Sequence, residues 1–209
     1  MSASGFLLEF RCALITGASS GLGLEYARQI APCAETLILV ARREQLLEEI
    51  ATDLATSFPH LRVKIFASDL VRDTGRDHLI NSLSKAGLYP DLLVNNAGMG
   101  DYGEFRSSNW SKTEQMIRLN MEALTHLTHA LLPGLIARQG AILNISSLAS
   151  VLPIPDFAVY SATKAYVTSF SEALRLELSD QGVRVLAVCP GPVLSLIHIS
   201  EPTRLWTIS

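Results

Sequence analysis

The chain has 209 residues, of which 48% are hydrophobic and 18% charged, a composition that excludes a disordered protein and predicts a single domain with a large core. Its net charge of −3, without a run of like charges, argues against nucleic acid as the main partner, because binding phosphates needs a basic patch. No apolar run reaches the roughly 20 residues of a membrane span, so we expect no membrane span, no signal peptide and a cytoplasmic location.

Short apolar stretches alternate with amphipathic helical patterns along most of the chain. Strands are predicted at Cys12–Thr16, Thr36–Ala41, Val63–Ala67, Asp91–Asn95, Ala141–Ser146 and Val183–Cys189. Helices are predicted at Gly21–Ile30, Glu44–Phe58, Arg72–Ala86, Trp110–Arg138 and Phe157–Gln181. Because most of these strands carry few charges, they suit a parallel sheet that is buried on both faces. The pattern therefore predicts an α/β fold, a doubly wound parallel sheet with helices on both faces.

Two features of this pattern need a further interpretation. The long stretch Trp110–Arg138 is interpreted as two helices or one bent helix, because Pro133 interrupts its end. The three cysteines, Cys12, Cys33 and Cys189, are odd in number. They are interpreted as buried, reduced thiols rather than a disulfide framework.

A glycine-rich turn, Thr16–Gly23, follows the first predicted strand and leads into the first helix. Glycines let the backbone approach a pyrophosphate closely, and the start of a helix supplies free N–H groups. A tight strand-to-helix turn that needs glycine for steric reasons alone is the alternative, since the spacing differs from the commonest dinucleotide fingerprint. We favour cofactor binding, through Gly17, Ser19, Ser20, Gly21 and Leu22.

The end of the second strand indicates which dinucleotide would bind. An acidic residue there would hydrogen-bond the adenosine ribose of NAD. Instead Ala41 is followed by Arg42 and Arg43, whose guanidinium groups can bind a 2′-phosphate. The alternative, that both arginines lie at a solvated helix start, is less favourable because cations are repelled by the positive end of a helix dipole. The sequence therefore predicts NADP(H).

Polar and small residues also follow the later strands. Asn96, Ala97 and Gly98 come after the fourth strand, and Ala97 and Gly98 allow a cofactor to approach the backbone closely. Ser147 follows the fifth strand, and Tyr160 and Lys164 lie beyond it, one helical turn apart on the same helix face.

These last three residues suggest an acid–base centre. A nearby cation and a positively charged nicotinamide would favour phenolate and lower the pKa of Tyr160. Tyr160 could then exchange a proton with a carbonyl or alcohol oxygen while the nicotinamide exchanges hydride, and Ser147 would hydrogen-bond the same oxygen. A Tyr-x-x-x-Lys pair alone usually means an ordinary helix surface, but the serine and the glycine-rich turn upstream favour chemistry.

The sequence resembles the short-chain dehydrogenase/reductase family, in its NADP-preferring type. In order along residues 11–193, it matches the family's Thr-Gly-x-x-x-Gly-x-Gly turn, Asn-Asn-Ala-Gly segment, active-site serine, Tyr-x-x-x-Lys pair and the Pro-Gly after the sixth strand. The resemblance implies a single-domain Rossmann-type doubly wound sheet with six strands present and the family's last strand and helix missing. It also implies that Asn95 braces the sheet.

The same resemblance assigns the site residues. The catalytic set would be Asn120, Ser147, Tyr160 and Lys164, with Asn120 at a helix kink and holding a water that links Lys164 to solvent. The further cofactor contacts would be Asp69, Leu70, Asn96, Ala97, Gly98, Tyr160, Lys164, Pro190, Gly191 and Val193. The family uses no catalytic metal, so Glu122, His126 and His129 are interpreted as surface or interface side chains.

The function implied is hydride transfer between NADP(H) and the carbonyl or hydroxyl carbon of an apolar ketone, aldehyde or secondary alcohol. The apolar preference comes from a group of residues around the reaction centre, Met99, Leu148, Val151, Leu152, Pro153, Ile154 and Phe157. A homodimer or homotetramer would form through Trp110–Arg138 and Phe157–Gln181. The alternatives are a non-catalytic NADP(H)-binding sensor or scaffold, an inactive truncated fragment, and an epimerase or dehydratase, whose family members usually have longer substrate domains.

The end of the sequence departs from the family pattern. After Val193 the segment Leu194–Arg204 resembles a translated adapter from sequencing-library preparation. We therefore interpret residues 1–193 as the dinucleotide-binding and catalytic domain and residues 194–209 as a non-native tail. On this interpretation the sixth strand has an exposed edge and the substrate cleft lacks its lid, so cofactor binding and turnover would be weak.

Overall fold

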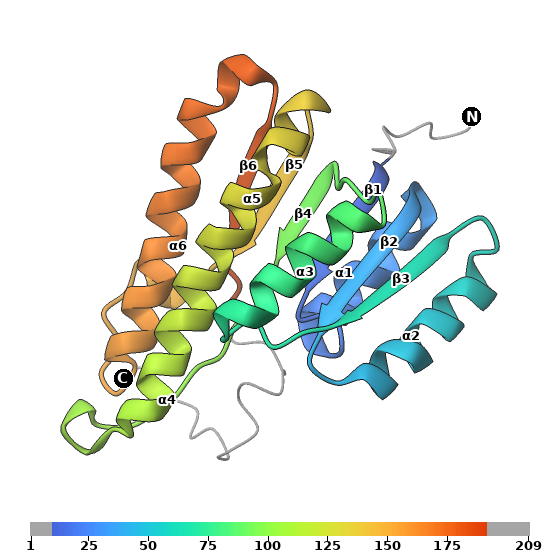
Figure 1. Cartoon of the computed structure of the whole chain (residues 1–209). Helices are drawn as coiled ribbons and strands as arrows, with labels where there is room; N and C mark the ends of the chain where they lie inside the picture. Colours follow the sequence, from blue (N-terminus) through green and yellow to red (C-terminus); the bar gives the residue numbers. More distant parts are fainter. Residues whose placement is uncertain (1–9, 192–209) are drawn as a thin grey trace, which may run out of the picture.

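The protein is described by a computed structural model over residues 10–191. Its sheet has six parallel strands in the order β3-β2-β1-β4-β5-β6 (Figure 1), which confirms the predicted fold class. The strands are β1 (Phe10–Thr16), β2 (Ala34–Ala41), β3 (Arg62–Ala67), β4 (Leu92–Asn95), β5 (Ala141–Ile145) and β6 (Arg184–Val188). The helices are α1 (Gly21–Ile30), α2 (Glu44–Ser57), α3 (Asp73–Lys85), α4 (Trp110–Ile117), α5 (Leu124–Ala137) and α6 (Ala158–Glu177). The predicted contact Val193 and the predicted tail lie outside the described residues.

The strand order reverses at β1, which pairs with β2 on one side and β4 on the other. Leu14 of β1 lies opposite Ile38 of β2 and also opposite Leu93 of β4. In open parallel sheets, ligands bind outside the carboxyl ends of the strands where the order reverses. The turn after β1 and the segment after β4 therefore lie at the place where a ligand is expected.

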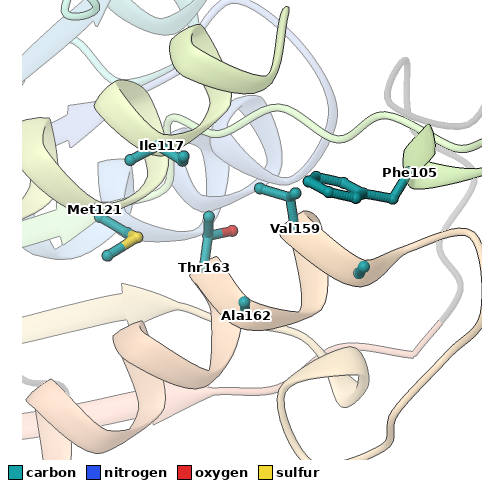
Figure 2. A pocket seen from close by; sticks show the side chains of 7 residues that line it. Phe105, Ile117, Met121, Val159, Ala162 and Thr163 are labelled. Carbon is teal, nitrogen blue, oxygen red and sulfur yellow. The ribbon is translucent and has the colours of Figure 1, made fainter. Parts of the chain in front are cut away.

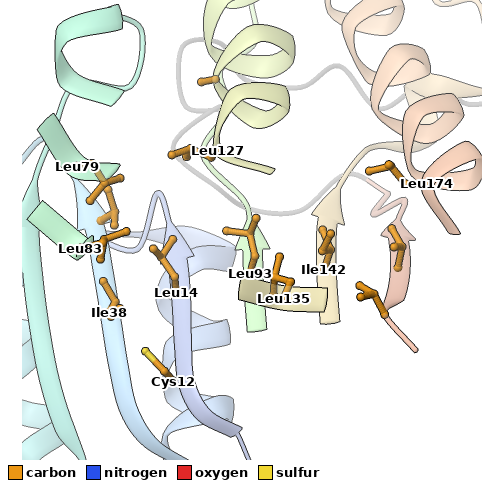
Figure 3. Close-up of a cluster of buried hydrophobic side chains, with 14 of the residues drawn as sticks. Cys12, Leu14, Ile38, Leu79, Leu83, Leu93, Leu127, Leu135, Ile142 and Leu174 are labelled. Atoms are coloured by element: carbon orange, nitrogen blue, oxygen red, sulfur yellow. The ribbon is translucent and has the colours of Figure 1, made fainter. Parts of the chain in front are cut away.

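Each face of the sheet carries its own apolar core. On one face, side chains from the strands meet α3, α5 and α6, as Figure 3 shows for Leu14 and Ile142 of the strands and Leu79, Leu127 and Leu174 of the helices. On the other face, α1 and α2 pack on β1, β2 and β4 through residues that include Ala27 and Leu47. These two cores hold the carboxyl ends of the strands in register.

The predicted long helix is interrupted, but not where the sequence analysis placed the break. A π-helical segment, η3 (Arg118–Ala123), separates α4 from α5, whereas Pro133 lies inside α5, which continues to Ala137. The prediction that Pro133 interrupts the helix was therefore wrong. The irregularity coincides with Asn120, whose buried side chain bonds to neighbouring segments.

The cysteines also differ from the expectation. All three are free, but only Cys12 is buried, whereas Cys33 and Cys189 are partly exposed. Burial raises the pKa of the Cys12 thiol to about 11, which keeps it protonated at neutral pH. Among residues 10–191, no helix is both long and apolar enough to cross a membrane.

Candidate active site

The turn after β1 depends on glycine at Gly17. Gly17 has a φ of +66°, and a Cβ atom there would lie 2.8 Å from Nδ2 of Asn96 and 2.9 Å from Cα of Ala97. Gly23, at the start of α1, has no room either, because a Cβ would collide with the carbonyl oxygen of Gly17. The glycines thus bring the turn, the first helix and the segment after β4 into direct contact.

Thr16 joins the two segments by hydrogen bonds. Its hydroxyl accepts from the backbone N–H groups of Asn96 at 3.0 Å and Ala97 at 2.9 Å. The side-chain amide of Asn96 donates in return to the backbone carbonyls of Thr16 at 2.9 Å and Gly17 at 3.3 Å. The glycine-rich turn and the Asn-Asn-Ala-Gly segment are therefore one hydrogen-bonded unit, and the sequence analysis did not identify Thr16 as its link.

The two arginines after β2 differ in their surroundings. A terminal nitrogen of Arg43 donates to the hydroxyls of Ser19 at 3.0 Å and Ser20 at 3.1 Å. Arg42 is exposed and makes no hydrogen bond or ion pair among the described residues. The structure thus brings Arg43, Ser19 and Ser20 together as a polar group beside the turn.

In the loop after β3, the carboxylate of Asp69 is available to the proposed cofactor site, but the side chain of Leu70 is not. Asp69 is held by the backbone N–H of Val71 at 3.2 Å and by Nε of Arg72 at 3.4 Å. Leu70 is buried in the core that α3 and α5 share, so its side chain is committed to packing.

Lys164 reaches the carboxyl edge of the sheet from α6. Its buried ammonium donates to the carbonyl of Ile145 at the end of β5, at 2.8 Å, and lies 5.8 Å from the centre of the Tyr160 ring. A Cβ on Gly98 would be 3.4 Å from Nζ of Lys164 and 3.3 Å from Oδ1 of Asn120. The residues predicted from three distant parts of the sequence therefore meet at one point.

Asn120 is fixed by hydrogen bonds on both sides of its amide. Its Oδ1 accepts from the backbone N–H of Met99 at 2.9 Å. Its Nδ2 donates to the carbonyl of Met99 at 2.9 Å and to the hydroxyl of Thr163 at 3.0 Å. Because Thr163 in turn donates to the carbonyl of Tyr160, the π-helical segment is joined to the helix that carries Tyr160 and Lys164.

Burial governs the pKa of the Tyr160 phenol. A hydrogen bond with Ser147 lowers the pKa of the Tyr160 phenol, but burial raises it more, so its pKa lies above the usual value. Burial also lowers the pKa of the Lys164 ammonium, from 10.5 to about 8, which still leaves this group mostly charged at neutral pH. The chain's own groups therefore keep Tyr160 as a neutral phenol at neutral pH, and the lowering of its pKa by a bound, positively charged nicotinamide stays a prediction.

A buried polar network lies behind the site. Asn95 of β4 donates to Thr128 of α5 at 3.0 Å and to Asn144 of β5 at 2.9 Å. Asn144 donates to the hydroxyl of Ser171 at 2.9 Å. Asn95 therefore links the sheet to α5, as the resemblance implied, while Asn144 and Ser171 were not identified. The sequence signal that could have revealed this network is the presence of one asparagine, Asn95 or Asn144, in each of two neighbouring apolar strands.

The predicted apolar group divides into packed and exposed members. Phe157 packs on the Tyr160 ring, with ring centres 5.6 Å apart, and Met99 joins the same cluster. In contrast, an apolar surface beside Ser147 is exposed to solvent, formed by Leu148, Val151, Leu152 and Ile154. Leu148 also donates its backbone N–H to the carbonyl of Pro190, and its Cδ1 would lie 3.5 Å from a Cβ on Gly191.

A groove of about 380 Å³ lies between α6 and the residues where α4 passes into η3 (Figure 2). Its lining is almost entirely apolar and comes from Phe105, Ile117, Met121, Ala158, Val159, Ala162 and Thr163. In the described part of the chain, no three His, Cys, Asp or Glu residues cluster as metal ligands would. Glu122 and His126 instead contact Arg76.

An open parallel sheet with a glycine-rich turn at its strand-order reversal defines a dinucleotide-binding class of α/β domain. The profile of the short chain dehydrogenase family matches residues 11–204, which extends past Val193 into the segment interpreted as a tail. The chain belongs to this family.

Similar proteins include several reductases. The chain is 34% identical over 197 residues to a very-long-chain 3-oxoacyl-CoA reductase of Rattus norvegicus, covering 91% of this chain and 62% of the relative. It therefore spans about three fifths of the length of that curated relative. A short-chain dehydrogenase from Sphingobium yanoikuyae, solved with NADPH, is 36% identical with a TM-score of 0.83, covering 90% of this chain and 73% of that one. An L-sorbose reductase from Gluconobacter frateurii, solved with NADPH and L-sorbose, is 33% identical with a TM-score of 0.84, covering 90% of this chain and 72% of that one.

Proposed function

We propose that this protein transfers hydride between NADP(H) and the carbonyl or hydroxyl carbon of an apolar ketone, aldehyde or secondary alcohol. The observation that carries the proposal is the convergence of Lys164 and Asn120 on Gly98, with the Tyr160 ring 5.8 Å from the Lys164 ammonium. A hydrogen bond between the side chains of Ser147 and Tyr160 adds Ser147 as the fourth member of the set. The bound nicotinamide would supply or accept the hydride.

The residues at the carboxyl edge fit this cofactor. The turn at Gly17 lies at the point where the strand order reverses, and it leads into the N-terminus of α1, whose free N–H groups could bind a pyrophosphate. The pairing of Arg43 with Ser19 and Ser20 gathers a guanidinium and two hydroxyls beside the turn, which supports the binding of a 2′-phosphate by these groups. The similar proteins solved with NADPH support the choice of NADP(H) over NAD(H).

The chain's own groups would perform the proton transfer. Burial keeps the Tyr160 phenol protonated, so Tyr160 would donate its proton to the carbonyl oxygen during reduction. Ser147 would donate a hydrogen bond to the same oxygen as negative charge develops there. Lys164, with a pKa of about 8, carries positive charge at neutral pH and would favour the phenolate that remains.

The exposed apolar surface beside Ser147 supports an apolar substrate. Val151 is 64% exposed and Leu152 is 56% exposed, and large apolar side chains left open beside a reaction centre favour an apolar ligand. The similarity to very-long-chain 3-oxoacyl-CoA reductases points in the same direction. The similarity to an L-sorbose reductase is the argument for a polar substrate, and a comparison of decan-2-one with L-sorbose would separate the two.

Tyr160→Phe tests the proposal directly. Removing the phenol oxygen should lower kcat by about 10²- to 10⁴-fold, because general acid catalysis contributes that much. The Kd for NADPH, measured by its fluorescence, should stay within about twofold, because the ring and its packing remain. Tyr166→Phe is the matched control, since Tyr166 lies on the same helix and bonds to Thr125 instead.

A sensor or scaffold predicts a different result for the same pair of variants. In that case the wild type would bind NADPH without turnover, and Tyr160→Phe would change neither property. Equal turnover by the wild type and Tyr160→Phe would refute Tyr160 as the proton donor.

We also propose a cytoplasmic homodimer or homotetramer that associates through the face formed by α4, η3 and α6. The apolar groove on this face, with Phe105 63% exposed, supports it. Ile117→Lys should lower the mass measured by light scattering, whereas a monomeric wild type would contradict the proposal. Cell fractionation would test the location.

A further inference from the structure

Arg76 is a buried charge that the proposed reaction does not use. It lies on α3 and is 2% exposed, the largest fully buried side chain of the described residues. Burying a guanidinium without partners is very costly, so its surroundings must satisfy it. Figure 1 shows α3 beside α5. The side chain of Arg76 reaches from α3 to Glu122 of η3 and His126 of α5.

Every N–H group of the Arg76 guanidinium has an acceptor. NH1 donates to the carbonyls of Leu70 at 2.9 Å and Val71 at 3.2 Å. NH2 donates to carboxylate oxygens of Asp73 and Glu122, both at 2.5 Å. Nε donates to Nδ1 of His126 at 3.3 Å. A planar fork with all donors used fixes the relative positions of its partners.

These partners come from two parts of the proposed active site. Leu70 and Val71 directly follow Asp69, the expected adenine contact, in the loop after β3. Glu122 belongs to η3 and lies two residues after Asn120. Arg76 therefore connects the loop at the adenine end of the site to the π-helical segment at its catalytic end.

The π-helical segment needs such contacts to persist. π-Helical turns are rare and are found mostly at functional sites. If η3 relaxed to an α-helix, the residues on its two sides would rotate relative to each other by about 100°, the angle between successive residues of an α-helix. Asn120 would then lose its alignment with Met99 and Thr163. The bonds of Asn120 hold one side of η3 and the Glu122–Arg76 pair holds the other.

We propose that Arg76 is a positioning residue, which through Glu122 keeps η3 in its π-helical form and the Asn120 amide in place. The expected effect of Arg76 on turnover rests on the proposed function. Its expected effect on the form of η3 does not. Arg76 does not contact the reacting groups described above. Its effect on turnover is transmitted through Asn120.

Glu122→Gln is the primary test, because it keeps an acceptor oxygen and removes only the charge. The full chain would be compared with Glu172→Gln, a matched control whose carboxylate pairs with Arg175 on α6, outside this network. Arg76→Met is a second variant that removes the whole fork. Amide hydrogen exchange at residues 99 and 118–124, the Kd for NADPH, and kcat for NADPH oxidation with decan-2-one would be measured for each.

We expect Glu122→Gln to raise exchange in 118–124 and at Met99 by about tenfold and to lower kcat by a similar factor, since a charge-assisted hydrogen bond is weakened. Its Kd for NADPH should stay within about twofold, because the Leu70 and Val71 bonds remain. Arg76→Met should also weaken NADPH binding. Glu172→Gln should match the wild type in all three measurements.

A double mutant separates positioning from general destabilisation. In the Asn120→Ala background, Glu122→Gln should no longer change kcat, because its effect passes through Asn120. The inference would be overturned if Glu122→Gln lowered kcat by the same factor in the Asn120→Ala background. It would also be overturned if the single variant left both amide hydrogen exchange and kcat unchanged. If the wild type itself neither binds NADPH nor turns over, the proposed function fails, and hydrogen exchange alone then decides whether Glu122 and Arg76 hold η3.

Discussion

The two halves of the sheet end in different kinds of site. At β1 and β2, the proposed ligand contacts come from backbone, from small residues such as Gly17 and from the Arg43–Ser19–Ser20 group. At β4 and β5, they come from polar side chains that distant segments hold in place, such as Asn120 and Lys164. The first half comes mostly from residues 16–43, although Asn96 and Ala97 complete its turn, whereas the second half is assembled from segments spread over residues 98–164. Variants in the first half should therefore change cofactor affinity more than turnover, and those in the second half should change turnover more than cofactor affinity.

The largest effect is expected for Gly17→Ala. Its Cβ would meet Asn96 and Ala97 at under 3 Å, at a φ of +66°, so NADPH affinity should fall about 100-fold and the free energy of unfolding by about 3 kcal/mol. Gly87→Ala is the matched control, with a φ of +65° and no atom within 4 Å. It should cost only about 1 kcal/mol and leave NADPH affinity unchanged. Fluorescence titration and urea unfolding measure both quantities, and equal effects of the two variants would contradict the close-approach argument.

Lys164, which belongs to the site at the ends of β4 and β5, should make the stability of the protein depend on pH. The Lys164 pKa is about 8 in the folded chain, against 10.5 as its ordinary value. The unfolded chain therefore binds this proton more tightly, which destabilises the fold below pH 8. This destabilisation disappears as the pH rises from about 8 to about 10.5. Relative to Lys164→Met, the free energy of unfolding of the wild type should rise over this range by roughly 3 kcal/mol.

Urea unfolding at neutral pH and near pH 10.5 measures that difference. Lys85→Met, which removes an exposed ammonium from α3, corrects for the change in net charge. If the difference in free energy of unfolding between the wild type and Lys164→Met instead stayed constant or fell between the two pH values, that result would show that burial does not destabilise the Lys164 ammonium.

A smaller effect is expected from the arginines beside the turn. Arg43→Ala should reduce the preference for NADPH over NADH about tenfold, because a guanidinium that binds a phosphate is removed. Arg42→Ala should change the preference less, since Arg42 has no partner in the described part of the chain. Dissociation constants for both cofactors measure the preference. A loss of NADH affinity as large as that of NADPH would mean that Arg43 holds the turn and does not select the phosphate.

Much of this architecture could be predicted from the sequence, because its signals are local. The run of charge-poor strands identified the parallel sheet, and α1 was predicted with the bounds that the structure has, Gly21–Ile30. Tyr160 and Lys164 are one turn apart, so helical geometry alone places them together. The glycine-rich turn could be predicted for a similar reason, because a backbone that other groups approach closely needs glycine at fixed positions.

The rest depends on contacts between distant segments. Pro133 is a strong local signal for a helix break, yet the helix changes form at Asn120, where bonds to Met99 and Thr163 decide the geometry. The direction in which the chain's own groups shift the pKa of Tyr160 also could not be predicted, because burial of the phenol is a property of the packed site and not of the Tyr–Lys spacing. Neither outcome has a signal within a short window of sequence.

The hydroxyl of Thr16 has a consequence for the order in which the protein can be assembled during synthesis. Its partners Asn96 and Ala97 are about 80 residues further along the chain. A ribosome that has released only β1, β2 and β3 has therefore not yet produced the residues that complete the turn after β1. Contacts this distant in sequence slow folding. Until β4 has been synthesised, the edge of β1 that pairs with β4 would stay exposed. The glycine-rich turn, first in the sequence, would thus be among the later parts to become competent for binding.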